Sequence, residues 1–313
     1  MAESCTAAAP CSTANLGPGY DVFGLALDAL EDKVKISKIS PGDGGKISIR
    51  NSDQSIPSMV ESNSAGLFVK RMMQDFEISD CIEIEIIKGV PPGYGIGSSA
   101  ASAAAAAIAF NSLYDLEIDK SKLVEYAAEG ELASAGIKHY DNVSASLLGG
   151  FVICSIARDS LQFIRLEPPQ DLVLVIAVPS LEVPKKKTEV ARSVLPIMVP
   201  LKDVVHNISG ASTIVAGFAA KDVETIARGI DDVIIESARK HLIPGYDNVK
   251  QNATSAGALA VTISGAGPSI IAFLKTHKNA EAVAAAMANG FENTGVKSKT
   301  YVCRASKGAR LLT

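Results

Sequence analysis

The chain has 313 residues, of which 47% are hydrophobic, 20% are charged and only 5% are aromatic, and its formal net charge is −4. This composition excludes a disordered chain, and the acidic, aromatic-poor balance excludes a dedicated nucleic-acid binder. The length suits two domains or one large domain.

Cysteines and uncharged stretches bear on the compartment. The five cysteines are widely spread without C-x-x-C spacing, which is typical of reduced, mostly buried thiols. The four histidines show no metal-binding spacing, so no structural metal is expected.

Uncharged stretches at 89–114 and 251–274 are long enough to cross a bilayer, but prolines, serines or glycine turns interrupt them. Because the N-terminus does not resemble a signal peptide, we expect a cytoplasmic protein without a membrane partner.

The first half of the chain combines short strands with helices. Alternating apolar and polar residues predict strands at 33–37, 47–49 and 82–86. A glycine-rich loop at 88–97 follows, and the alanine run after it predicts a tightly packed helix from Ser98 to Phe110. A second helix is predicted at 121–135, and a strand pair at 147–156 and 161–166.

The second half begins after a proline-rich linker at 167–170. The apolar run 172–178 predicts a buried strand. Further helices are predicted at 199–240, 246–256 and 280–289, and further strands at 258–263, 269–274 and 297–303. Because strands and helices mix without strict alternation, the fold class is predicted to be α+β rather than a doubly wound sheet.

Four short segments hold much of the glycine, and one predicts a phosphate site. The segments are Gly17-Pro18-Gly19, Gly93-Tyr94-Gly95-Ile96-Gly97, Gly149-Gly150 and Gly265-Ala266-Gly267. In the second, glycines let the backbone approach a ligand, and the helix that follows offers unpaired N–H groups to an anion. No Walker A string occurs, and Ser98 stands where a dinucleotide fingerprint needs its third glycine. The alternative is a flexible turn with an N-cap serine.

Together these segments resemble the three motifs of the GHMP kinases, named for galactokinase, homoserine kinase, mevalonate kinase and phosphomevalonate kinase. Pro92–Ala101 resembles the central ATP-phosphate motif, and Ser264–Ser269 resembles the C-terminal glycine motif. Ser12–Asp21 resembles the first motif in its homoserine kinase form. Because the three motifs follow the family order, the resemblance covers nearly the whole chain.

Within the family, the resemblance favours the homoserine kinase group. Mevalonate kinase and galactokinase carry a basic residue near the first motif, whereas this chain has none between Met1 and Lys33. Segments at 138–151, 188–196 and 236–245 also look like homoserine kinase. The resemblance implies ATP-dependent phosphorylation of the side-chain hydroxyl of L-homoserine, giving O-phospho-L-homoserine on the route to threonine.

The resemblance also implies an architecture. Residues 1–167 would form an N-terminal α+β ATP-binding domain that carries the phosphate loop. Residues 168–313 would form a ferredoxin-like α/β sandwich, with the active site between the two domains. Family members are often homodimers, so a homodimer is a candidate assembly.

Homoserine carries a carboxylate, an ammonium group and a primary hydroxyl, and each needs a partner. Guanidinium groups suit carboxylates because they form two parallel hydrogen bonds. Within the matching segments, the candidates are Arg192 and Arg239 for the carboxylate, Asn15 and Asp21 for the ammonium group, and His139 and Asn142 for the hydroxyl. Taken singly, each arginine is more typical of a surface salt bridge, and the histidine of a satisfied, partly buried side chain.

The resemblance assigns a further set of residues to ATP and Mg²⁺. The expected phosphate-binding residues are Pro92, Gly93, Tyr94, Gly95, Ile96, Gly97, Ser98, Ser99, Gly265 and Gly267, with Asn63 expected near the adenine. Ser99 is assigned to Mg²⁺ with Glu131, and Ser98 to a phosphate, although the two serines could exchange roles. Glu129 competes with Glu131 for the metal.

The catalytic residues implied are His139, Asp141 and Asn142. Asp141 is either the base or structural, because phosphoryl transfer through a loose transition state can proceed by positioning and electrostatics. The same chemistry on mevalonate, a sugar or shikimate is one alternative. A catalytically silent, metabolite-binding relative is another; it would lack the metal ligands, whereas Ser99 and Glu131 are both present.

Overall fold

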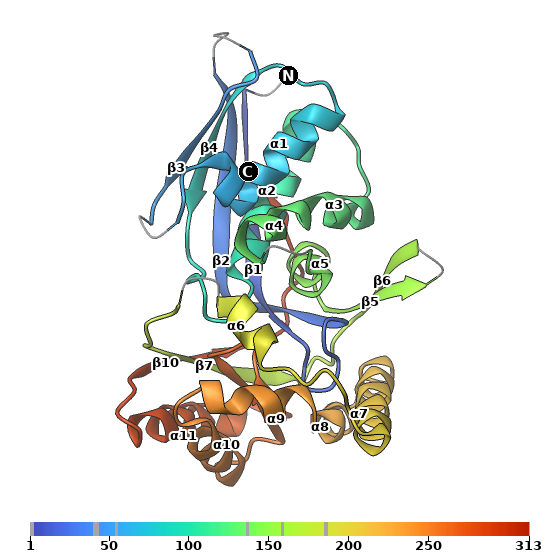
Figure 1. The fold of residues 1–313 in the computed structure, drawn as a ribbon, viewed down its shortest axis with the longest axis vertical. Coiled ribbons are helices and arrows are strands. Elements are labelled where there is room, and N and C mark those ends of the chain that lie inside the picture. The colour runs from blue at the N-terminus through green and yellow to red at the C-terminus, as the bar shows by residue number, and fades with distance from the viewer. Residues whose placement is uncertain are drawn as a thin grey trace.

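Figure 1 shows the computed structural model of the chain, which describes residues 3–39, 44–53, 56–135, 138–157, 160–184 and 187–312. Two sheets lie one above the other, and each has its own helices. The small helix α6 (Lys187–Ser193) lies between these two parts of the molecule. The expected α+β class and two-part architecture are confirmed.

The first sheet has seven strands. They are β1 (Ser4–Ala14), β2 (Phe23–Ile39), β3 (Ile47–Asn51), β4 (Cys81–Ile87), β5 (Phe151–Ala157), β6 (Ser160–Leu166) and β11 (Arg310–Leu312). The order is β11-β1-β2-β4-β3, and β5 pairs with both β2 and β6. Ile82, Ile84 and Ile86 of β4 are fully buried while the glutamates between them are not, as the alternation predicts.

Helices lie beside this sheet (Figure 1). They are α1 (Ser64–Asp75), α2 (Ser98–Leu113), α3 (Lys120–Ala127), α4 (Glu129–Ala135) and α5 (Tyr140–Leu148). The alanine-rich helix α2 is buried along almost its whole length, between the sheet and α1. Its small side chains let neighbouring backbones approach closely, so the phosphate loop before it rests on a rigid element.

The second sheet has four antiparallel strands in the order β10-β7-β9-β8. They are β7 (Val173–Pro179), β8 (Ala260–Ile263), β9 (Ile270–Leu274) and β10 (Ser298–Cys303). Helices α10 (Tyr246–Ser255) and α11 (Ala280–Glu292) pack on one face of this sheet, and α7 (Leu201–Ala220), α8 (Val223–Gly229) and α9 (Ile235–Arg239) complete this part. The result is a two-layer α/β sandwich.

Several element boundaries differ from the predictions. The helix expected at 121–135 is two helices, α3 and α4, whereas the helical patterns expected at 199–240 do form helices there, α7, α8 and α9. Leu147 and Leu148 end α5 instead of starting a strand, because Gly149 and Gly150 take positive φ angles that break the helix. The strand then starts at Phe151.

The first and last strands were not predicted, and they pair with each other. β1 consists largely of small residues, with Pro10 inside it, so it shows no alternation. β11 returns to the first sheet and pairs with β1, although it lies within the segment expected to form the C-terminal domain. The predicted linker at 167–170 does connect the last strand before it, β6, with the first strand of the second sheet, β7. The domain boundary at 167/168 stays a prediction.

The remaining global features concern helices and thiols. Among the described residues, no helix is both long and apolar enough to span a bilayer. All five cysteines are free thiols, and four of them are buried.

Candidate active site

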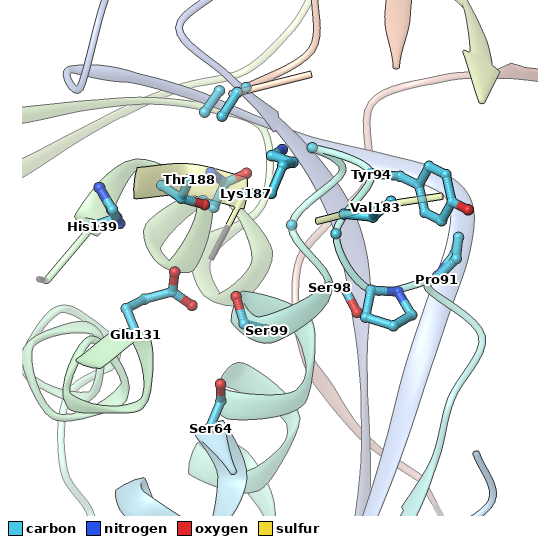
Figure 2. Close-up of a pocket in the computed structure, with 18 of the residues that line it drawn as sticks. Ser64, Pro91, Tyr94, Ser98, Ser99, Glu131, His139, Val183, Lys187 and Thr188 are labelled. Atoms are coloured by element: carbon cyan, nitrogen blue, oxygen red, sulfur yellow. The ribbon is translucent and has the colours of Figure 1, made fainter. Parts of the chain in front are cut away.

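A cavity of about 850 Å³ opens where the two parts of the molecule meet. The first part of the molecule lines it with the phosphate loop (residues 93–97), the start of α2, α4 and the start of α5. The second part lines it with α6, Arg239 and the third glycine motif, which is the C-terminal motif Ser264–Ser269. Figure 2 shows Ser99 and Glu131 across the cavity from Lys187 and Thr188. The three motifs read from the sequence therefore meet in one place.

The phosphate loop is held by backbone and hydroxyl contacts from both other motifs. Gly93, Gly95 and Gly97 all adopt positive φ angles, a conformation that glycine takes without strain. A Cβ on Gly95 would overlap the carbonyls of Ser264 and Gly267. Because backbone packs against backbone here, the loop keeps a fixed shape with its amides available to an anion.

The side chains of the loop mostly anchor it. The Tyr94 hydroxyl donates to the Leu181 carbonyl at 3.0 Å, and Ile96 is buried in the core between the two sheets. Pro92, Gly93 and Tyr94 line the cavity, whereas Ile96 does not. The loop therefore presents backbone rather than bulky side chains to the cavity.

Ser98 and Ser99 open helix α2, but their hydroxyl groups have different partners. The Ser98 hydroxyl donates to the Val90 carbonyl at 2.7 Å. The Ser98 hydroxyl proton is therefore used by the loop backbone, and its expected contact with a phosphate stays a prediction. The Ser99 hydroxyl instead forms a hydrogen bond with Glu131, and Figure 2 shows these two side chains facing each other.

A buried ion pair fixes the point where strand β4 gives way to the loop. Asp32 is fully buried, and one of its oxygens accepts the backbone N–H groups of Gly89 and Val90, both at 3.0 Å. Its other oxygen pairs with Lys88 Nζ, which also donates to the Ser98 carbonyl at 3.0 Å. The pair thus joins the start of the loop to the first turn of α2.

Two buried carboxyl groups, Glu131 and Asp141, line the cavity. Burial raises the pKa of Glu131 to about 7, although its hydrogen bond with Ser99 lowers it. Burial and the nearby Asp21 also raise the pKa of Asp141 to about 7. Glu129 instead pairs with Lys138 Nζ at 2.5 Å and is partly exposed.

The chemistry of the Ser99 hydroxyl and the Glu131 carboxylate fits a magnesium ion. Among the described residues, no group of three or more histidine, cysteine or acidic side chains forms a ready-made metal site. Mg²⁺ is a hard cation, usually bound by one or two carboxylates together with water and substrate phosphates. A hydroxyl and a carboxylate beside a phosphate loop are therefore a sufficient protein contribution.

Two arginines and Tyr20 form the other end of the cavity. The guanidinium carbons of Arg192 and Arg239 lie 5.5 and 5.1 Å from the Tyr20 ring centroid. Arg192 donates to Asp21 Oδ2 at 2.6 Å and contacts His139 Nε2 at 2.8 Å, while its buried Nε has no hydrogen-bond partner among the described residues. Arg239 is only 3% exposed and donates through Nε to the Ala191 carbonyl at 3.0 Å. The structure thus brings both predicted arginines together.

Asn15 shapes the first motif. It takes a positive φ angle, its Nδ2 donates to the Gly265 carbonyl at 2.8 Å, and its Oδ1 accepts the Asp21 N–H at 3.1 Å. The amide therefore ties the first motif to the third. Of the two expected ammonium acceptors, Asn15 already uses its amide oxygen for the Asp21 N–H, whereas Asp21 offers a carboxylate that pairs with Arg192.

The start of α5 carries the three residues expected near the reacting hydroxyl. His139 is the N-cap residue of α5, and burial together with Arg192 lowers its pKa, which favours the neutral imidazole. Asn142 Oδ1 accepts the Ser12 hydroxyl at 3.0 Å. Asp141 is 4% exposed and accepts the Asn142 N–H at 2.7 Å, so it supports the residue beside it.

Asn63 lies at the start of α1 and holds the local backbone. Its Oδ1 accepts the Gly66 N–H at 3.1 Å as the N-cap of α1, and its Nδ2 donates to the Pro57 carbonyl at 2.8 Å. Asn63 lines the cavity, but its side-chain amide serves the local backbone. The adenine contact expected of Asn63 stays a prediction.

The comparisons with known proteins settle the family. The model of the GHMP kinases N terminal domain matches residues 63–150, and that of the GHMP kinases C terminal region matches residues 214–293. The two matches cover more than half of the chain. The chain belongs to the GHMP kinase family.

Individual members of the GHMP kinase family are similar over nearly the full length. The homoserine kinase of Thermoplasma volcanium is 38% identical over 301 residues, which are 96% of this chain and 94% of that protein. The homoserine kinase of Methanopyrus kandleri is 41% identical over 305 residues, 97% of each. The crystal structure of homoserine kinase from Cytophaga hutchinsonii has a TM-score of 0.92 at 35% identity, covering 100% of this chain and 98% of the other.

Three parts of this GHMP kinase site were not singled out from the sequence. The Asp32–Lys88 pair joins residues far apart in the chain, and its only signal is a lysine directly before a glycine-rich loop. Tyr20 falls within the first motif, but nothing in the pattern predicts that it lies between two arginines. Lys187 directly precedes a segment that was recognised, yet its position in the cavity depends on the fold of α6.

Proposed function

We propose that the protein is a homoserine kinase, which uses ATP to phosphorylate the side-chain hydroxyl of L-homoserine. One observation carries this proposal: a single cavity is lined both by a phosphate loop at a helix start and by two arginines grouped with an aspartate. The first set suits a nucleotide phosphate. The second suits a small molecule with both a carboxylate and an ammonium group. The similarity to homoserine kinases over nearly the full length supports it.

The reaction moves one phosphoryl group. The homoserine hydroxyl oxygen forms a bond to the γ-phosphorus of ATP while the bond from that phosphorus to the β,γ-bridging oxygen breaks. ADP leaves, the hydroxyl proton is released, and O-phospho-L-homoserine remains. This product belongs to threonine biosynthesis.

We assign the phosphates to the loop and to the start of α2. The backbone amides of residues 93–99 would bind the phosphates, and Gly265, which packs against Gly95, lines the same cavity. Ser99 and Glu131 would hold Mg²⁺. When bound, this ion supplies positive charge that neutralises the β- and γ-oxygens.

The acceptor is assigned to the arginine end of the cavity. Arg192 and Arg239 bind the homoserine carboxylate, and the unpartnered Nε of Arg192 supports a planar, two-bond contact. Asp21 binds the ammonium group. Because the Asp21 carboxylate pairs with Arg192 in the structure, the ammonium group would compete with Arg192 for that carboxylate. His139 and Asn142 orient the hydroxyl.

Proton removal needs no strong base in this assignment. Asp141 accepts the Asn142 N–H and is buried behind it, so we assign it a positioning role. Proton loss then follows the developing bond to phosphorus, as a loose transition state allows.

An acceptor panel distinguishes the alternatives. ADP release from Mg-ATP should be stimulated at least tenfold by L-homoserine, and far less by L-serine, mevalonate, shikimate or galactose. Mevalonate and shikimate share the carboxylate but lack the ammonium group that Asp21 would recognise. Strong stimulation by one of these and none by L-homoserine would overturn the proposal, and no stimulation by any would favour the silent binding protein.

Assembly and location complete the proposal. Free, mostly buried thiols are typical of a reducing compartment, which supports a cytoplasmic location. A homodimer is also proposed, from the family resemblance alone, and light scattering on the purified protein would give its mass.

A further inference from the structure

Lys187 lies in the wall of the cavity at the first position of α6. Its Nζ donates a hydrogen bond to the carbonyl of Gly267 in the third glycine motif. Figure 2 shows it beside Thr188, across the cavity from Ser99 and Glu131. None of the roles assigned above uses this lysine.

The hydrogen bond places the ammonium group next to the phosphate loop. The Gly267 carbonyl that accepts it lies so close to Gly95 that a Cβ there would overlap it. Lys187 Nζ is therefore separated by one carbonyl group from the middle glycine of the loop. A cation at this point is near any phosphate that the loop amides bind.

The same lysine also lies near the arginine end of the cavity. Arg192 follows on the same short helix, and the Arg239 guanidinium is close enough to disfavour the charged form of Lys187. Lys187 thus stands between the loop assigned to the nucleotide and the arginines assigned to the acceptor. The transferred phosphoryl group must pass through this region.

Its electrostatic environment differs from that of Lys88 and Arg192 and is similar to that of Arg239, which also donates to neutral carbonyls. Lys88 pairs with Asp32 and Arg192 pairs with Asp21, but the hydrogen bond that Lys187 makes within the described chain goes to a neutral carbonyl. Burial and Arg239 lower its pKa to about 7. An anion entering the cavity would favour the protonated form and relieve this unfavourable arrangement.

We propose that Lys187 is a further catalytic residue, whose ammonium group contacts the phosphoryl group of the nucleotide on the side that faces the acceptor. This inference rests on the proposed function. The fixed positive charge would stabilise the negative charge on the phosphoryl oxygens during transfer. Lys187 would complement Mg²⁺, which is assigned to the opposite wall.

Nucleotide binding without turnover tests this role. Calorimetric titrations with Mg-ADP and with the non-hydrolysable Mg-AMP-PNP compare wild type, Lys187→Met, Lys187→Arg and Lys202→Met, the last changing an exposed lysine on α7. Lys187→Met should weaken AMP-PNP binding at least tenfold and ADP binding less than threefold. Lys187→Arg should retain most of the AMP-PNP affinity, and Lys202→Met should match wild type.

Proton uptake supplies a readout that a purely structural role would not change. At pH 7.5, titrations in two buffers of different ionisation enthalpy should show that wild type takes up more protons on binding AMP-PNP than Lys187→Arg does. The other titratable groups lining the cavity are present in both proteins, so their contributions cancel: Tyr20, Asp21, Asp53, Lys88, Tyr94, Glu131, His139, Asp141, Glu182, Arg192 and Arg239. Lys187→Arg keeps the charge, which makes the comparison valid even if Lys187→Met does not fold.

Three results would overturn the inference. Equal losses for ADP and AMP-PNP would make Lys187 a support for the Gly267 turn, and unchanged affinity for both nucleotides would show that Lys187 does not contact the phosphoryl group. Equal proton uptake in wild type and Lys187→Arg would show that Lys187 makes no ionic contact with the phosphoryl group. These titrations need no acceptor, so they can fail while the acceptor panel succeeds, and the reverse.

Discussion

At the scale of single residues, Glu131 decides the metal assignment. It is buried beside Ser99, and its carboxylate is the one acidic group that the proposal gives to Mg²⁺. We expect Glu131→Gln to lower kcat by about 100-fold or more. Homoserine affinity, measured without metal, should stay within about threefold.

A neighbouring glutamate supplies the control for this prediction. Glu129 lies two residues earlier on the same helix but pairs with Lys138 at its outer side. Glu129→Gln should therefore leave kcat near the wild-type value. Steady-state kinetics at several Mg²⁺ concentrations measure both variants, and equal effects at the two positions would contradict the assignment.

Arg239 tests the carboxylate site. Lysine keeps the positive charge but loses the planar fork that binds a carboxylate through two bonds. Arg239→Lys should raise the KM for homoserine by about 10- to 100-fold and change kcat less. The exposed Arg228 on α8 offers a matched control, since Arg228→Lys should change neither constant. An unaltered KM for homoserine in Arg239→Lys would show that Arg239 does not bind the carboxylate.

The titration of Lys187 affects stability as well. Its pKa in the folded protein is about 7, whereas an unfolded lysine binds its proton up to about pH 10. Between these values the unfolded chain binds more protons, so this residue makes the free energy of unfolding rise with pH. The free energy of unfolding of Lys187→Met should exceed that of wild type more at pH 7 than at pH 9. The difference between the two proteins should shrink by roughly 2 kcal/mol over this range. Urea unfolding at both pH values measures it, and a difference independent of pH would contradict the titration.

At the scale of elements, the contact between β2, β4 and the phosphate loop depends on Asp32. Asp32→Asn would leave Lys88 buried opposite a neutral group, so we expect a loss of about 3–5 kcal/mol in the free energy of unfolding. Adding Lys88→Met should restore part of that loss, because the unpaired charge is removed. Glu31→Gln, which changes a half-exposed ion pair with Arg310, should cost less than about 1 kcal/mol. Urea unfolding checks all four proteins, and a small effect of Asp32→Asn would show that the pair does not stabilise the loop.

Elements with a repeating pattern were predictable, and those without one were not. Helix α2 follows from its alanine run, and β4 from its alternation. Strand β1 has neither signal, because its stability comes from pairing with β2 and β11 rather than from its own residues. The break at Gly149-Gly150 was visible as composition, but whether it ended a helix or lay inside a strand depended on the backbone angles.

The site divides in the same way. Resemblance selects residues by motif, and the structure does bring Arg192, Arg239, Ser99 and Glu131 to one cavity. One sequence cannot show where each hydroxyl or amide donates its proton, so it did not reveal that Ser98 and Asn63 bond to the local backbone. Lys187 and Asp32 matter through contacts between distant segments, which one sequence does not reveal.

At the scale of the whole molecule, the cavity lies where the two sheets share a core. Residues of both parts pack together there, and the rings of Phe151 and Phe218 stack with centroids 3.9 Å apart. Ligands that contact both sides of the cavity should therefore stabilise the entire chain. We expect Mg-AMP-PNP with L-homoserine, each near 100 times its dissociation constant, to raise Tm by at least about 3 °C. Calorimetry should show one transition moving as a unit, and two transitions of which only one moves would contradict this coupling.

In the proposed reaction, the protein transfers the γ-phosphoryl group of ATP to the side-chain hydroxyl of L-homoserine. Phosphorus NMR of the purified protein with Mg-ATP and L-homoserine tests it most directly, because it identifies the product as well as the loss of ATP. A new phosphomonoester signal, coupled to the side-chain methylene protons of homoserine and growing in step with ADP, is the predicted result. Hydrolysis to inorganic phosphate, or no change until another alcohol is added, would contradict the account.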